Sequence, residues 1–115
     1  MPCIQIRTNV KVDVDQAERI KAGLGRVISL FPGKSEDWLM VVVEDGCRMY
    51  FGGAAGKPLA VVEVNILGTK IDASAANEMT KEVTAIVRDN LGVAPDDMYI
   101  KYVASPDWGW NGKNF

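Results

Sequence analysis

Five stretches of the chain carry hydrophobic patterns typical of β-strands. Residues 3–8 alternate in polarity, and one face of this predicted strand consists of Ile4, Ile6 and Thr8. Residues 38–44 form a nearly continuous apolar run, which favours a strand buried on both faces beneath helices. Residues 59–67 and 98–103 are predicted as two further strands, and residues 48–51 as a short additional one.

Apolar residues recur at helical spacing in two segments between these strands. The first apolar stripe consists of Ala17, Ile20, Leu24, Val27, Ile28 and Phe31. The second consists of Ala76, Met79, Val83, Ile86, Val87 and Leu91. Asp15 and Glu18 resemble a capping box at the start of the first helix. Pro32-Gly33 is expected to end that helix, and Gly92 the second.

The order strand, helix, strand occurs twice, over about residues 3–44 and 59–103. Each half is therefore predicted to be a βαβ unit with parallel strands. We expect one α+β domain over residues 1–115, in which both units share a four-stranded mixed sheet with two helices on one face. Residues 104–115 form a tail. Apolar alternation in the last two long strands predicts that the other sheet face is covered in a symmetric oligomer.

Composition excludes several classes of function. A formal net charge of −2 provides no basic surface for nucleic acid. The chain has no histidine, and Cys3 and Cys47 are too far apart for a metal-binding motif, so we expect no metal and a reducing compartment. Residues 52–58 (GGAAGKP) lack the spacing of a phosphate-binding loop.

No apolar run reaches membrane-spanning length, and no basic segment followed by an apolar one resembles a secretory signal. We therefore expect folding in the cytosol, without membrane insertion. Release from the cell by a route that needs no signal peptide stays open.

Pro2 is the candidate for acid–base chemistry. Without histidine, a free N-terminal amine is the group that titrates nearest neutral pH. Removal of Met1 would make Pro2 a secondary amine, and apolar surroundings would lower its pKa. While Met1 is present, the nitrogen of Pro2 belongs to an amide and is not a base.

An ordered set of short motifs resembles the macrophage migration inhibitory factor family of the tautomerase superfamily. These motifs are Met1-Pro2-Cys3, Thr8-Asn9-Val10, Gly33-Lys34, Met49-x-Phe51-Gly52-Gly53, Leu67-Gly68, Tyr99-Ile100 and Gly109-Trp110-Asn111-Gly112 with Phe115. The resemblance covers nearly the whole chain in order. It implies a homotrimer with sites at subunit boundaries and a cofactor-free reaction. That reaction is keto–enol tautomerisation of aryl pyruvates, such as phenylpyruvate or hydroxyphenylpyruvate, and of dopachrome-like compounds.

The resemblance also implies residue roles. Pro2 falls on the catalytic base, and Lys34 on the lysine that holds a substrate oxygen. Leu67 falls on a position whose backbone contacts the ligand. Tyr99 and Lys101 fall on positions that a neighbouring subunit contributes. The hydrophobic walls correspond to Trp38, Trp108, Trp110 and Phe115.

Each role has a simpler alternative. Lys34 could complement the end of a helix, and Lys101 could be a solvated strand lysine. The four aromatic residues could serve packing alone. Lys101 stands where mammalian members have Asn, and a second cation there would depress the pKa of the amine further. The family's redox cysteine pair is absent, so thiol–disulfide activity is not expected. A cytokine-like protein that binds a cell-surface receptor is the alternative function.

Overall fold

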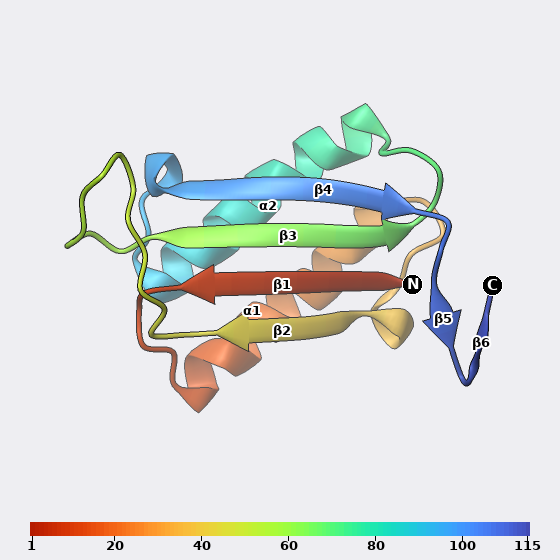
Figure 1. The fold of residues 1–115 in the computed structure, drawn as a ribbon, viewed down its shortest axis with the longest axis horizontal. Helices are drawn as coiled ribbons and strands as arrows, with labels where there is room; N and C mark the ends of the chain where they lie inside the picture. Colours follow the sequence, from red (N-terminus) through yellow and green to blue (C-terminus); the bar gives the residue numbers. More distant parts are fainter.

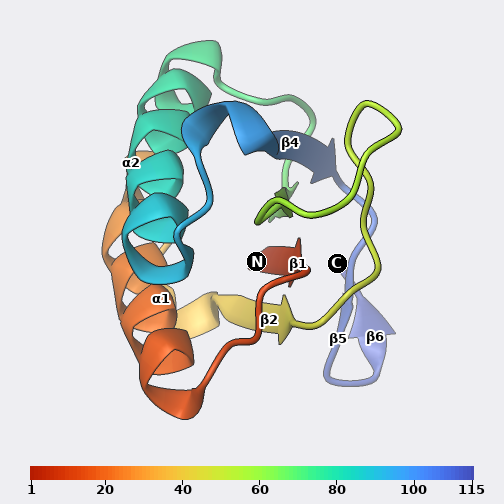
Figure 2. The same ribbon diagram turned by 90° about the vertical axis from the view of Figure 1, so that its left-hand side faces the viewer.

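The computed structural model describes all 115 residues and contains one four-stranded sheet, ordered β2-β1-β3-β4. The strands are β1 (Pro2–Thr8), β2 (Met40–Glu44), β3 (Ala60–Leu67) and β4 (Met98–Ser105). Both long helices, α1 (Val14–Val27) and α2 (Ala73–Leu91), cover the same face of this sheet (Figures 1 and 2). Neither helix is both long enough and apolar enough to cross a membrane.

Shorter elements connect and extend this framework. Three 3-10 turns span Ile28–Leu30, Glu36–Trp38 and Pro95–Asp97. The tail forms a hairpin of β5 (Gly109–Trp110) and β6 (Lys113–Asn114), which the sequence analysis did not predict. Figure 1 shows both chain ends at the same end of the sheet.

Strand pairing confirms the two βαβ units. β1 runs parallel to β2, and β3 runs parallel to β4, with one helix in each crossover. The units join through antiparallel pairing of β1 and β3, which makes the sheet mixed. The predicted α+β architecture is therefore correct.

The core lies between the sheet and the helices. Buried and less buried side chains alternate along β1 and β3, because successive strand residues point to opposite faces. In β1 the buried face is the one that carries Ile4, Ile6 and Thr8, as the sequence pattern indicated. The fully buried residues on these elements include Ile4, Ile6, Val62, Val64, Ile20, Leu24, Met79 and Val83. Thr8 is also buried, and its hydroxyl donates to the carbonyl of Leu59 at 2.7 Å.

The N-cap of helix α1 lies two residues before Asp15, the first residue of the predicted capping box. The N-cap is Asp13, whose side chain accepts a hydrogen bond from the Gln16 amide at 2.8 Å. The Gln16 side chain accepts from the Asp13 amide at 2.9 Å. The assignment to Asp15 and Glu18 was wrong because Asp13 and Gln16 have the same spacing and satisfy both end amides. Gly92 ends α2 in the left-handed conformation, with φ of 68°, as predicted.

Strand β2 corrects a second prediction. It begins at Met40 rather than Trp38, and it lies at the sheet edge. Met40 is 64% exposed, so the strand is not buried on both faces in one chain. The two central positions belong to β1 and β3, each of which pairs on both sides. The additional strand predicted at residues 48–51 is also wrong, since only an isolated bridge joins Phe51 to Ala54.

The sheet face opposite the helices is more polar than predicted. Gln5, Glu63 and Lys101 are neighbours in register across three strands. A weak ion pair joins Lys101 Nζ to Glu63 Oε2 at 4.0 Å. Most apolar strand residues lie on the face that the helices cover. The apolar pattern of the strands therefore gives little support for an oligomer that packs through the opposite face.

Candidate active site

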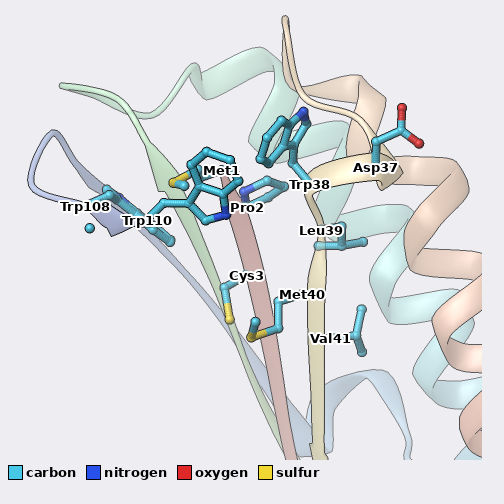
Figure 3. A pocket seen from close by; sticks show the side chains of 11 residues that line it. Met1, Pro2, Cys3, Asp37, Trp38, Leu39, Met40, Val41, Trp108 and Trp110 are labelled. Carbon is cyan, nitrogen blue, oxygen red and sulfur yellow. The ribbon is translucent and has the colours of Figure 1, made fainter. Parts of the chain in front are cut away.

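A cavity of about 620 Å³ lies at the N-terminal end of β1. Because β1 and β2 are parallel, their starts lie together at this end of the sheet, and the tail reaches it from the end of β4. Three chain segments therefore build the cavity (Figure 3). Its lining consists of Met1, Pro2, Cys3, Asp37, Trp38, Leu39, Met40, Val41, Trp108, Gly109 and Trp110.

The N-terminus lies in surroundings that disfavour positive charge. Burial lowers the pKa of the Met1 amine below its ordinary value, and the nearby charge of Lys34 lowers it further. Pro2 itself is buried. With Met1 attached, the nitrogen of Pro2 is an amide nitrogen, so the lowered pKa belongs to the amine of Met1.

Lys34 and Leu67 are held beside the N-terminus by two hydrogen bonds. Lys34 Nζ donates to the carbonyl of Leu67 at 2.8 Å. The amide of Leu67 donates to the carbonyl of Met1 at 3.0 Å. The structure therefore brings Pro2, Lys34 and Leu67 together. Lys34 and Leu67 do not line the cavity while Met1 is present.

Aromatic residues from two distant segments meet at the cavity. The ring centroids of Trp38 and Trp110 are 5.1 Å apart, and their planes are at 77°. Phe115 does not line the cavity, but its ring is nearly parallel to that of Trp110, with centroids 6.5 Å apart. Trp108 lines the cavity, and its indole nitrogen is buried without a hydrogen-bond partner.

The tail hairpin places Trp110 at this position. Its two-residue turn has Asn111 at φ 53° and Gly112 at φ 81°, the backbone that Asn-Gly favours in tight hairpins. Asn111-Gly112 is thus a local sequence signal for the hairpin, although no hairpin was predicted in the tail. Leu39, Met40 and Val41 also line the cavity, whereas the sequence pattern predicted them in a strand buried on both faces.

Cys3 lines the cavity as a thiol rather than a thiolate. Burial raises its pKa, and the charge of Glu63 adds to this effect. Both cysteines are unpaired. The site therefore offers an amine, a lysine and apolar walls, a set suited to moving a proton next to an anionic group.

Comparison with known proteins identifies the family. The model of the family described as "Macrophage migration inhibitory factor (MIF)" matches residues 1–115. The chain belongs to the MIF family.

Individual relatives agree with this assignment over nearly their full length. The macrophage migration inhibitory factor of Meriones unguiculatus is 27% identical, covering 100% of this chain and 99% of the relative. The crystal structure of Leishmania major MIF2 has a TM-score of 0.91 and 29% identity, covering 100% of this chain and 97% of that one. A homologue from Prochlorococcus marinus has a TM-score of 0.82 and 30% identity, covering 98% of each chain.

Tyr99 and Lys101, two further residues assigned by resemblance to the MIF family, lie away from this cavity and from the N-terminus within one chain. Tyr99 pairs in register with Val61, near the far end of the sheet. It lines a second cavity of about 460 Å³ and contacts Phe51, with ring centroids 5.3 Å apart. Lys101 lies on the same sheet face as Tyr99, beside Glu63. A role for either residue next to Pro2 requires a second copy of the chain.

Proposed function

We propose that this MIF-family chain is a cofactor-free keto–enol tautomerase of aryl pyruvates. Phenylpyruvate, hydroxyphenylpyruvate and dopachrome-like compounds are the expected substrates. The observation that carries the proposal is the placement of the N-terminus, where the pKa of the Met1 amine is lowered, beside Lys34 and an apolar cavity. A neutral amine near pH 7 is what a general base for carbon acids needs.

The proposed reaction moves one proton in two steps. After Met1 is removed, the Pro2 amine takes a proton from the carbon next to the substrate's ketone, and the electrons of the broken C–H bond move onto the ketone oxygen. The positive charge of Lys34 stabilises the enolate. The protonated Pro2 amine then returns the proton to the enolate oxygen, which gives the enol, and the reverse direction regenerates the ketone.

Loss of Met1 would also release a hydrogen-bond donor. The Leu67 amide donates to the carbonyl of Met1 in the unprocessed chain. Once that acceptor is gone, the same N–H can donate to a substrate oxygen, while Lys34 retains donors beyond the one used by Leu67. These two groups would hold the carboxylate or the enolate oxygen.

The remaining assigned residues fit a homotrimer with shared sites. Tyr99 and Lys101 would come from a neighbouring subunit, because one chain keeps them away from Pro2. The apolar walls would be formed by Trp38, Trp108, Trp110 and Phe115. We place the reaction in the cytoplasm, with release by a route that needs no signal peptide as a further expectation.

Removal of the base tests the function directly. Protein without Met1, verified by intact mass, should accelerate keto–enol exchange of phenylpyruvate. Protein that retains Met1 should be slower by about 10²- to 10⁴-fold, the usual contribution of a general base. Pro2→Gly replaces the secondary amine with a primary one and should lose about tenfold or more in kcat/KM. Pro58→Gly in the distant loop is the matched control, and wild-type turnover in Pro2→Gly would contradict the proposal.

A receptor-binding role is the second candidate. It is favoured by the shared family and by the name of the rodent relatives, macrophage migration inhibitory factor. In that case, binding to a cell-surface receptor should survive in Pro2→Gly protein that has lost turnover. Loss of both properties together would tie any receptor binding to the cavity itself.

A further inference from the structure

Trp38 and Trp110 form a corner of two indole rings on the cavity wall. Their planes meet at 77°, with centroids 5.1 Å apart, and both residues line the cavity. Their exposed fractions are 53% and 48%, so about half of each large residue faces solvent. Two neighbouring exposed indoles in a concave site are a surface that binding of an apolar group would cover.

Both indoles stand on short hydrogen-bonded elements. Trp38 closes the 3-10 turn Glu36–Trp38, where its amide donates to the carbonyl of Ser35 at 3.3 Å. Trp110 stands on the β5–β6 hairpin, opposite Lys113. The end of that hairpin is held by the Phe115 amide, which donates to the carbonyl of Trp108 at 3.0 Å. The corner therefore exists before a ligand arrives, which reduces the ordering cost of binding.

The geometry of the corner suits a flat ring system. A ring that stacks on one indole presents its edge to the other, and both arrangements are favourable for aromatic pairs. A fused two-ring group can contact both indoles over their full width, whereas a single ring covers less of the same surface. The cavity volume of about 620 Å³ is ample for the larger group. Met1 also lines this cavity, so its removal leaves more room.

We propose that Trp38 and Trp110 make this site selective for two-ring aryl pyruvates over one-ring aryl pyruvates. The proposal rests on the proposed tautomerase function for the reacting end of the substrate. The selectivity itself depends only on the indole corner. Indole-3-pyruvate and phenylpyruvate are the matched probes, because they share the same reacting group and differ in the ring.

Binding of unreactive analogues tests the selectivity without turnover. Indole-3-propionate and 3-phenylpropionate share a carboxylate and a two-carbon chain, and neither has a ketone. Calorimetry with Met1-free protein should give a Kd about tenfold lower for the indole compound, the size of effect expected from a modest addition of apolar contact. A ratio of the two Kd values near one would overturn the proposal.

Variants of Trp38 and Trp110 test whether the selectivity comes from the two indole rings or from the apolar character of the cavity in general. Trp38→Leu and Trp110→Leu should bring the Kd ratio toward one, mainly by weakening the indole compound. Trp38→Phe keeps an aromatic face and should retain an intermediate ratio, which guards against a folding defect in the leucine variants. Leu30→Ala, at a half-exposed position that does not line the cavity, is the control and should leave the ratio unchanged. An unchanged ratio in both leucine variants would overturn the proposal.

Kinetics distinguish this inference from the proposed function. Indole-3-pyruvate should have a kcat/KM about tenfold above that of phenylpyruvate. If neither acid reacts but the Kd ratio and its dependence on Trp38 hold, the tautomerase proposal fails and the two-ring specificity stands. If both acids react equally and the analogues bind equally, the specificity fails and the tautomerase proposal stands.

Discussion

At the N-terminus, the amine and the side chain of Lys34 are the groups whose charges affect each other. The pKa of the Met1 amine is lowered mainly by burial and further by the charge of Lys34. In a lower dielectric, a neighbouring positive charge makes protonation of the amine less favourable. Lys34 would then have two effects, since it keeps the base neutral and stabilises the enolate.

The first prediction concerns the pH dependence of this base. The kcat/KM for phenylpyruvate should rise with pH as the Pro2 amine loses its proton, with an apparent pKa below that of an exposed N-terminal proline. Lys34→Met removes a positive charge that opposes protonation, so the apparent pKa should rise and activity should shift to higher pH. The kcat/KM at its plateau should also fall by about 10²-fold, because the enolate loses its cation.

The matched control for this prediction is Lys81→Met. Lys81 is an exposed lysine on α2 that pairs with Glu78 at 3.1 Å. Its removal changes the net charge by the same amount and should leave the pH–rate profile in place. An unshifted profile in Lys34→Met would show that burial alone lowers the pKa of the amine.

Among the elements, helix α1 and the tail hairpin each depend on a short local motif. The motif in α1 fixes where the helix begins, and the motif in the hairpin fixes the position of Trp110. In α1, the reciprocal bonds of Asp13 and Gln16 satisfy end amides that the helix leaves without partners. In the hairpin, Asn111 and Gly112 both have positive φ values, which hold the turn that carries Trp110.

Substitution of the observed cap should destabilise the protein, whereas substitution of the predicted cap should not. Asp13→Ala is expected to reduce the free energy of unfolding by about 1 kcal/mol, because the Gln16 amide loses its acceptor. Asp15→Ala should change it by less than about 0.5 kcal/mol. Urea unfolding at a fixed protein concentration measures both, and equal losses would contradict the assignment of Asp13 as the N-cap.

The hairpin turn should control substrate binding rather than chemistry. Gly112→Ala places a Cβ at φ 81°, a conformation that favours glycine, and so strains the turn. We expect KM for phenylpyruvate to rise several-fold with kcat nearly unchanged, because Trp110 and Phe115 lose their fixed positions. Gly53→Ala, with a similar φ of 80° in a distant loop, is the control. A fall in kcat alone would indicate a different role for the tail.

On the scale of the whole molecule, the separation of Tyr99 from Pro2 determines whether one chain can form the whole proposed site. The two lie toward opposite ends of the sheet, since Pro2 pairs with Ile66 and Tyr99 pairs with Val61. One chain therefore cannot bring them to one cavity. A ring of copies in which one end of each chain meets the other end of the next could do so.

Subunit complementation tests this arrangement. Pro2→Gly and Tyr99→Ala should each have low activity alone. After the two proteins are unfolded together and refolded at equal amounts, about a quarter of the sites should combine an intact Pro2 with an intact Tyr99 from a neighbour. Recovery of about that share of wild-type activity is expected. Activity no higher than the mean of the two separate variants, or a monomer by sedimentation, would contradict a shared site.

Local patterns in the sequence were sufficient for the two helices, for the four sheet strands to within two residues, and for the apolar face of β1. A period of two or of 3.6 residues is set by backbone geometry, so each inward face can be identified without its partner. Gly92 could be assigned for the same reason, because a left-handed residue after a helix is a local requirement. Pro2 as the candidate base followed from composition, and its partners Lys34 and Leu67 from the family resemblance.

Tertiary structure alone decided which strand lies at the edge, which residues line the cavity and which assigned residues remain apart. Strand β2 has the apolar composition of a buried strand, yet pairing of β1 with β3 leaves it at the edge. Trp38 and Trp110 are far apart in sequence and meet only because parallel pairing and the tail bring their segments to one end of the sheet. Long-range pairing has no local signature, because it depends on the free energy of the whole sheet rather than on any one segment.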